Sequence, residues 1–197
     1  AASGDFLQGS ALYKNQNGAP DKVVLSWHRA GEGIQALSIP QKPDTQQWAW
    51  SLLSETSQDE ALSVGDINND GVDDILLGTK WLEGDALKVN ILSDTHEEPD
   101  RNLLADLNGD GLQDAIVGFQ AISKNGRLVW YQQPKLNKHL QWEEHLIAEV
   151  IGPMSLDVTD LDQDGDLDVI VGEHNLKSPE QARLIWFENT KGDATRW

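Results

Sequence analysis

The sequence predicts an all-β protein made of β-propeller blades, each a sheet of four antiparallel strands. An acidic motif recurs three times along the 197 residues, with spacings of 40 and 54 residues. Apolar residues alternate with period two or form short runs, and we find no amphipathic helix of three turns. Repeats of this length with four strands each are typical of propeller blades, so we expect about four blades here.

The motif has three well-kept copies, GDINNDGVDDILLG (65–78), ADLNGDGLQDAIVG (105–118) and TDLDQDGDLDVIVG (159–172). They align without a gap. An eroded fourth copy, LYKNQNGAPDKVVLS, begins at Leu12. We therefore expect one repeat domain, 1–197, whose four units occupy approximately 1–56, 57–97, 98–150 and 151–197.

Each unit should supply four strands. The first enters the acidic loop, at 62–64, 103–104 and 156–158, and the second leaves it, at 75–77, 115–117 and 169–171. The third carries a Trp-aromatic pair, at 128–131 and 184–187, and is expected at 87–92 in the shorter unit. The fourth is led by Trp, at 48–53 and 142–148; the final ATRW resembles the start of another, which predicts a longer chain.

The eight tryptophans are unusually many, and most are expected to pack between neighbouring sheets. A blade buries both faces of its sheet, which favours continuous apolar runs such as DVIVG over strict alternation.

The acidic loops have the composition of divalent-cation sites. Calcium binds six to eight oxygens from carboxylates, amide carbonyls and backbone carbonyls. Loop positions 1, 3, 5 and 9 would supply side chains, namely Asp66, Asn68, Asp70 and Asp74; Asp106, Asn108, Asp110 and Asp114; and Asp160, Asp162, Asp164 and Asp168. Position 7 would supply a backbone carbonyl, from Val72, Leu112 or Asp166. Gly71, Gly111 and Gly165 at position 6 fit a sharp turn with positive φ.

These loops are not EF-hands, because position 12 is Leu77, Val117 or Val171 within a strand-like run, where an EF-hand has Glu. Since each loop offers at least five ligands and the loop is repeated, we expect about three structural Ca²⁺ ions, not a catalytic metal. The alternative is an Asx-type turn without metal.

The motif DxDxDGxxD followed by an apolar strand resembles the FG-GAP/VCBS repeat family. The resemblance implies calcium-binding loops between the first two strands of each blade, usually in seven-bladed propellers of extracellular adhesion and carbohydrate-active proteins. The first unit departs from the pattern, with Tyr13 at position 1 and Asn15 and Asn17 at positions 3 and 5, and should hold no metal. Asn at position 3 should weaken the loops at 66–74 and 106–114 relative to the loop at 160–168.

The net charge of −18 argues against nucleic acid and anionic lipid as partners. No apolar run is long enough to insert into a membrane. Three calcium ions carry six positive charges, which would leave a net charge of −12. The resemblance implies an extracellular or cell-surface protein, or a periplasmic one. Its expected partners are a glycan or extracellular protein and further blades of a longer chain or another copy.

The loops that follow the second strands should lie on the face opposite the acidic loops. Their candidate ligand-binding residues are His28, Arg29, Lys80, Trp81, Gln120, His174 and Asn175, a set suited to sugars. Ordinary loop polarity is the alternative explanation. Three functions stay open: a non-catalytic module that recognises carbohydrate or protein, part of a polysaccharide-active enzyme such as a propeller-type lyase, or a purely structural adhesion module. No nucleophile or metalloprotease motif accompanies the five histidines.

Overall fold

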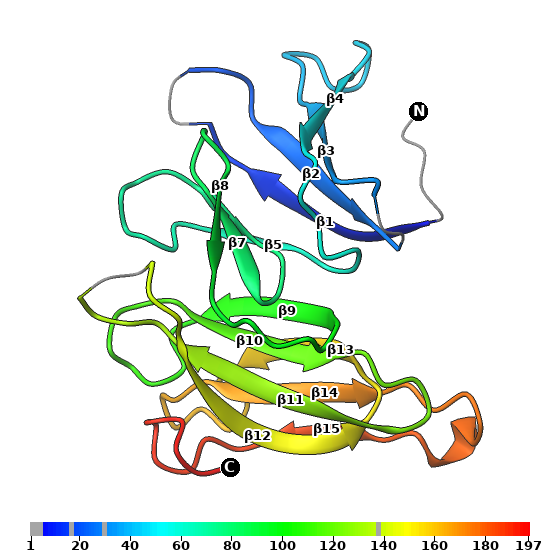
Figure 1. Ribbon diagram of the computed structural model, residues 1–197, viewed down its shortest axis with the longest axis vertical. Helices are drawn as coiled ribbons and strands as arrows, with labels where there is room; N and C mark the ends of the chain where they lie inside the picture. Colours follow the sequence, from blue (N-terminus) through cyan, green and yellow to red (C-terminus); the bar gives the residue numbers. More distant parts are fainter. Residues whose placement is uncertain (1–5, 16–17, 29–30, 137–138) are drawn as a thin grey trace. The chain divides into compact units, whose positions relative to one another are not determined.

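A computed structural model describes residues 6–15, 18–28, 31–136 and 139–197 of the chain. Over these residues the fold is all-β, with fifteen strands in four antiparallel sheets and one short 3-10 helix, η1 (Pro179–Gln181) (Figure 1). The chain divides into two compact units, Ala1–Asn90 and Ile91–Trp197. The described residues contain no helix with the length and apolar character that crossing a bilayer requires.

The first unit contains two four-stranded sheets, each with its strands paired in sequence order. One sheet comprises β1 (Leu7–Tyr13), β2 (Lys22–Trp27), β3 (Ile34–Ser38) and β4 (Ala49–Ser54). The other comprises β5 (Ser63–Gly65), β6 (Asp74–Leu76), β7 (Lys80–Glu83) and β8 (Lys88–Ile91), which ends at the unit boundary. Sequential pairing of this kind is the strand order of a propeller blade.

The second unit also contains two sheets. The first comprises β9 (Pro99–Ala105), β10 (Asp114–Phe119), β11 (Asn125–Gln132) and β12 (Glu143–Ile151). The second comprises only β13 (Pro153–Thr159), β14 (Asp168–Glu173) and β15 (Leu184–Phe187). The all-β fold class with four blade-type sheets is confirmed, and the seven-bladed ring stays a prediction.

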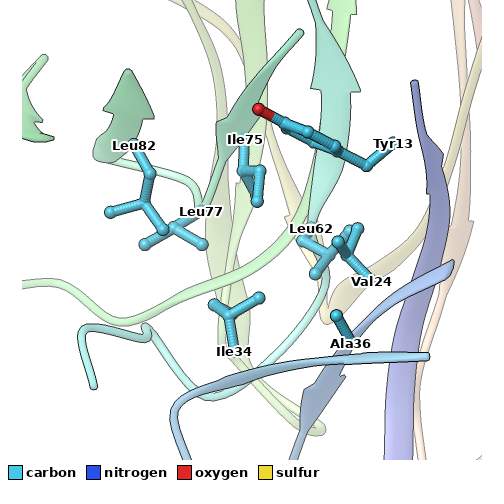
Figure 2. Close-up of a cluster of buried hydrophobic side chains, with 8 residues drawn as sticks. All are labelled: Tyr13, Val24, Ile34, Ala36, Leu62, Ile75, Leu77 and Leu82. Atoms are coloured by element: carbon cyan, nitrogen blue, oxygen red, sulfur yellow. The ribbon is translucent and has the colours of Figure 1, made fainter. Parts of the chain in front are cut away.

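The core of the first unit lies between its two sheets (Figure 2). Because side chains alternate along a strand, Val24 of β2 faces this core while its neighbour Leu25 faces away from it. The buried members are Tyr13, Val24, Ile34 and Ala36 from the first sheet and Leu62, Ile75, Leu77 and Leu82 from the second sheet and its entry. Packing of the two apolar faces therefore holds the two sheets of this unit together.

The second unit repeats this arrangement. Ile116, Leu128 and Trp130 from one sheet pack with Val169 and Val171 from the other. At the end of β10, a side chain on Gly118 would lie 2.4 Å from the Pro153 carbonyl oxygen. The motif ends in glycine here because the backbone of the next sheet approaches too closely for a Cβ atom.

One strand prediction was wrong. The third strand of the second sheet is β7, Lys80–Glu83, and residues within the predicted 87–92 strand form the fourth strand, β8. A tight turn, in which the Leu77 amide donates to the Lys80 carbonyl at 2.8 Å, brings β7 directly after β6. The predicted connecting loop at 79–85 is therefore mostly strand.

Candidate metal centre

The three acidic loops share one hydrogen-bond pattern, organised by the carboxylate at position 1. In the loop at 160–168, the Asp160 carboxylate accepts the amides of Asp164 and Gly165, both at 3.1 Å. The matching distances are 3.0 and 2.9 Å from Asp66 and 3.0 and 2.8 Å from Asp106. The position-1 carboxylate therefore fixes the same turn in all three copies.

The side chains at positions 3 and 5 continue the pattern. Oδ1 of Asp162 accepts the Asp164 amide at 3.2 Å, and Oδ1 of Asp164 accepts the Asp166 amide at 3.0 Å. In the other two loops, Asn68 and Asn108 accept the position-5 amide at 2.9 and 3.0 Å. Backbone amides thus orient the oxygens of positions 1, 3 and 5, and the position-6 glycines have φ of 85–102° as predicted for the sharp turn.

The aspartate at position 9 is buried and links the loop to the third strand. Asp168, which is 1% exposed, accepts the Leu161 amide at 3.1 Å on Oδ2 and the Asn189 amide at 2.9 Å on Oδ1. Asp74 and Asp114 make the same pair of contacts, with amides at loop position 2 and just after the third strand. Position 9 therefore has a structural role in holding the loop on its sheet.

Burial makes the position-9 carboxylates of the first two acidic loops costly to ionise. It raises the pKa of Asp74 to about 6 and of Asp114 to about 7, although their backbone donors act in the opposite direction. In the third loop, desolvation raises the pKa of Asp162, and the charges of Asp164, Asp168 and Asp160 add to it. Asp74, Asp114 and Asp162 are therefore unfavourable as bare anions, and a cation bound nearby would stabilise their charged forms.

The structure brings three of the predicted carboxylate ligands of the last loop together. Each of Asp160, Asp162 and Asp164 has a carboxylate oxygen, and these oxygens lie within 4.8 Å of one another. An oxygen-only cluster of this size suits a hard cation such as Ca²⁺. The Asp166 side chain lies instead beside Gly192, where a Cβ atom would be 2.4 Å from its oxygens, which leaves only its backbone carbonyl for the ion.

The loop at 106–114 also fits a cation. Asp110 Oδ2 is buried and accepts no hydrogen bond. Its charged neighbour is Lys135, whose Nζ lies 3.5 Å away. A buried carboxylate oxygen that accepts no hydrogen bond can bind a cation. Because the Lys135 ammonium group lies beside the same oxygen, it would compete with a bound ion, and the sequence alone did not suggest this.

A second residue missed by the sequence reasoning is Glu83, at the end of β7. Its carboxylate accepts the Asn68 amide group at 3.3 Å and the Asn90 amide group at 3.1 Å. It lies one residue before Gly84, whose backbone amide binds the position-9 Asp74. No pattern within the acidic motif points to Glu83, because it approaches the loop from the end of the third strand.

The eroded copy in the first unit keeps part of the same turn. The Asn15 amide donates to Asp21 Oδ1 at 3.1 Å, much as the Asn68 amide donates to Asp74 at 3.3 Å. The Asn15 side chain bonds the Pro20 carbonyl and is thereby oriented within the loop. The predicted lack of metal stays a prediction here, and Asn17 lies outside the described residues.

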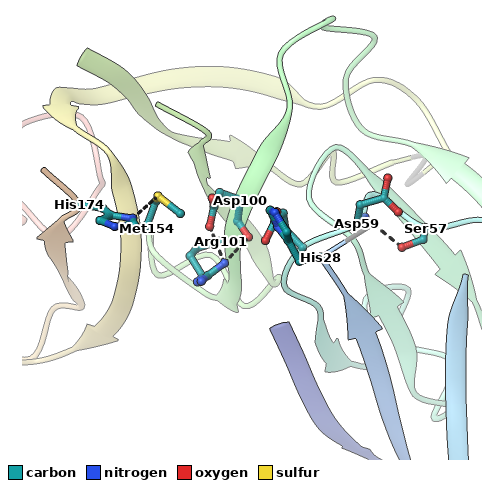
Figure 3. A network of polar contacts seen from close by, with 8 residues as sticks. His28, Ser57, Asp59, Asp100, Arg101, Met154 and His174 are labelled. Atoms are coloured by element: carbon teal, nitrogen blue, oxygen red, sulfur yellow. Dashed lines mark hydrogen bonds and ion pairs between the residues drawn. The ribbon is translucent and has the colours of Figure 1, made fainter. Parts of the chain in front are cut away.

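The described candidate ligand-binding residues of the first unit, His28, Lys80 and Trp81, do not form one binding site. Trp81 is fully buried in β7, so its ring is not accessible to a sugar, and the amide of Lys80 donates to Gln58 at 2.9 Å. His28 stacks on Phe6 with ring centroids 4.6 Å apart and contacts the buried Glu60 through Nδ1 (His28 is drawn in Figure 3). Arg29 lies outside the described residues.

In the second unit, His174 and Asn175 have internal partners. His174 Nδ1 lies 2.9 Å from the Met154 sulfur (Figure 3), and the Asn175 side chain, 9% exposed, accepts the Ser178 amide at 3.1 Å. Gln120 differs, because it lines a polar hollow of about 390 Å³. The other lining residues are His96, Glu97, Glu98, Phe119, Lys124, Asn125, Gly126, Arg127 and Glu149.

A larger hollow of about 740 Å³ lies on the first sheet, on the face turned away from the core. Three indole rings line it, and two of them are held by hydrogen bonds: Trp48 to the Pro43 carbonyl at 3.1 Å and Trp50 to Gln35 at 3.1 Å. The lining residues are Leu7, Leu25, Trp27, Leu37, Gln47, Trp48, Ala49 and Trp50. None of these described residues carries a titratable side chain.

Four sheets of sequentially paired strands, three of them with an acidic loop between the first two strands, define a blade-repeat protein. Residues 106–171 match the model of the FG-GAP-like repeat, so this part of the chain is similar to that family. The match begins at position 1 of the second well-kept loop and ends in the strand after the third. No curated protein matched the sequence.

Proposed function

We propose that the chain is a non-catalytic repeat module whose sheets are stabilised by three calcium ions. The observation that supports this most is the hydrogen-bond pattern that recurs in all three acidic loops and orients side-chain oxygens at positions 1, 3 and 5. A turn held only by Asx-type bonds would not require so many like charges.

The ions would be held by the side chains at positions 1, 3 and 5 with the backbone carbonyl at position 7. Bound calcium supplies positive charge to a turn whose carboxylates otherwise repel one another. The position-9 aspartates, already bonded to two backbone amides each, would tie the loaded loop to its sheet. Since the ion binds the folded loop, its binding free energy adds to stability.

Thermal unfolding in calcium, in chelator and in chelator followed by excess calcium tests this proposal. At a free calcium concentration of 100 times Kd, each site contributes about 2.7 kcal/mol. We expect chelation to lower the melting temperature by at least about 10 °C and calcium to restore it. An unchanged melting curve would remove the metal from the proposal, and equal restoration by magnesium would argue against a calcium-type site.

The module's recognition role is proposed for the Trp-lined hollow of the first unit, with a carbohydrate as its ligand. Trp50 is 50% exposed, and bonds to Gln35 and Pro43 hold the Trp50 and Trp48 rings. Indole rings of fixed orientation stack on the apolar faces of sugars. Because the lining residues include no acid or base, binding is favoured over catalysis there.

A glycan array tests the carbohydrate ligand. We expect one glycan class to bind the chain and Trp50→Ala to reduce that signal at least about tenfold. Trp186→Ala is the matched control, since Trp186 is also partly exposed, at 43%, but lies in the other unit. Absence of any bound glycan would favour the purely structural module.

If the chain belongs to a polysaccharide-active enzyme, the candidate site for catalysis is the polar hollow of the second unit. His96, Lys124 and Arg127 are among the residues that line this hollow. Arg127 already binds the carboxylates of Glu97 and Glu144, which reduces the charge it can offer to a substrate. Polysaccharide cleavage that is lost in His96→Ala would establish the lyase function.

The proposed setting is extracellular, where calcium concentrations keep sites of modest affinity filled. The FG-GAP-like repeat and the acidic net charge of −18 support this setting. Export of a tagged chain, followed by protease accessibility, would test it.

A further inference from the structure

The second unit contains two acidic loops, and one buried asparagine is hydrogen-bonded to both. Asn189 follows β15 and is 0% exposed. Its backbone amide donates to Oδ1 of Asp168, at position 9 of the loop at 160–168, at 2.9 Å. Its side-chain Nδ2 donates to the carbonyl oxygen of Leu107, at position 2 of the loop at 106–114, at 3.0 Å. Asn189 therefore links the two loops, although they belong to different sheets.

These bonds continue to the buried aspartate of each loop. The Leu107 amide donates to Oδ2 of Asp114 at 3.2 Å, and the Leu161 amide donates to Oδ2 of Asp168 at 3.1 Å. Four consecutive hydrogen bonds, which we call the Asn189 network, therefore connect Asp114, Leu107, Asn189, Asp168 and Leu161. Every member except Leu161 is at most 1% exposed, so these bonds lie in a medium of low polarity that strengthens them.

The turn that begins at Asn189 also lies against both loops. Oδ1 of Asn189 accepts the Ala194 amide at 3.0 Å, which closes the turn. Within it, a Cβ atom on Gly192 would lie 2.4 Å from the Asp166 carboxylate oxygens. On the other side, a Cβ atom on Gly109 would lie 3.9 Å from the Gly192 carbonyl oxygen. A displacement of either loop would therefore disturb contacts with the same turn.

We propose that Asn189 couples the two acidic loops of the second unit, so that calcium bound in one loop raises the calcium affinity of the other. The inference rests on the proposed function, because it requires calcium in both loops. Leu107 lies between the candidate ligands Asp106 and Asn108, so an ion in that loop restricts the carbonyl group that Asn189 binds. In the other loop, the bonded Asp168 is itself a candidate ligand.

The expected coupling is favourable because the two loops share the cost of ordering one network. Once a first ion has restricted its loop and the turn at Asn189, the second loop has less conformational freedom to lose on binding. Repulsion between two bound cations acts in the opposite direction. Salt at 0.15 M screens that repulsion beyond about 8 Å, so titrations at this concentration or above favour the contribution of the network.

Calorimetric titration of the full chain measures the coupling. All proteins carry Asp70→Ala, which removes the candidate site of the first unit. Adding Asp164→Ala leaves only the loop at 106–114, and adding Asp110→Ala leaves only the loop at 160–168. The coupling factor is the overall binding constant of the two-loop protein divided by the product of the two single-loop constants. We expect a factor of about five or more.

The role of Asn189 is tested by measuring the same factor after Asn189→Ala, which should reduce it to about one. The matched control is Asn175→Ala. Asn175 is a largely buried asparagine of the same unit, at 9% exposure, and its side chain accepts the Ser178 amide outside the loops. This control should leave the coupling factor unchanged.

Hydrogen exchange tests the network without a substitution at Asn189, which covers the case in which Asn189→Ala does not fold. In the protein with Asp70→Ala and Asp110→Ala, calcium loads only the loop at 160–168. Exchange of the Leu107 amide in the other loop should nevertheless slow about fivefold more than that of Val129 in β11, which reports general stabilisation.

Three results would overturn the inference and leave the calcium proposal standing. They are a coupling factor of one in the two-loop protein, a factor that Asn189→Ala leaves unchanged, and equal slowing of exchange at Leu107 and Val129. A chain that takes up no calcium would overturn the proposed function and the coupling together.

Discussion

Two substitutions in one loop should separate the structural role of an aspartate from its role as a metal ligand. Asp168 at position 9 is buried at 1% exposure, while Asp164 at position 5 is exposed. The structure assigns backbone anchoring to the first, and the calcium proposal assigns ion binding chiefly to the second. Asp168→Ala and Asp164→Ala should therefore respond differently to chelator.

The cost of Asp168→Ala follows from its two hydrogen bonds. The substitution leaves the buried Asn189 amide and the partly buried Leu161 amide without an acceptor. Each orphaned donor costs about 1–3 kcal/mol, with the lower value for the partly buried one. We expect Asp168→Ala to lower the free energy of unfolding by about 2–4 kcal/mol, in chelator as well as in calcium.

Asp164→Ala removes only one exposed bond, from the Asp166 amide at 3.0 Å, so in chelator it should cost about 1 kcal/mol or less. In calcium it also removes the contribution of one ion, about 2.7 kcal/mol at 100 times Kd. Its destabilisation should therefore appear mainly when calcium is present.

Urea unfolding of the wild type and the two variants, each in calcium and in chelator, measures these free energies directly. The difference between the two conditions should fall by about the value of one site in Asp164→Ala. Equal destabilisation by Asp164→Ala in both conditions would refute the ligand role, and a negligible effect of Asp168→Ala would refute the anchoring role.

Other predictions test features outside that loop. The side-chain hydrogen bonds from Arg183 lower the pKa of Glu173 to about 2, so this pair stabilises the fold above about pH 4.5 and loses that effect as the pH falls towards 2. The stability gap between wild type and Arg183→Gln should accordingly be largest near pH 6 and close between pH 4.5 and 2; a gap that is constant with pH would contradict it. Lys135→Gln should strengthen calcium binding to the Asp110 loop about two- to fivefold at low salt, and calorimetry in high salt should show a smaller difference. Gly118→Ala should destabilise the fold by about 1–3 kcal/mol in urea unfolding, because its Cβ atom would meet the backbone of β13; an unaffected midpoint would show that the sheets can separate there.

The acidic loops and most strands could be predicted from the sequence because the residues that determine them are close together in the chain. The spacing of aspartates within nine residues determines which carboxylates share a turn, and the following apolar run determines the strand. The network around Asp160, Asp162 and Asp164 lies where the motif placed it. Position 9 was predicted as a ligand, and its bonds to the third strand could not be read from the motif, because Asn189 lies 21 residues away.

The misplaced strand has a physical reason. The four residues of β7 are too few to show a period, and their polar ends suggest a loop, yet Trp81 and Leu82 are fully buried. Lys135 and Glu83 were missed because they approach the loops from the ends of third strands, at a sequence distance that no spacing rule covers. Tertiary packing, not local pattern, decided both cases.

Calorimetric titration of calcium into the chelated chain tests the central claim most directly. The account predicts three sites, one in the first unit and two in the second, and loss of one site in Asp164→Ala. A chain that takes up no calcium, while its sheets stay folded, would contradict the account.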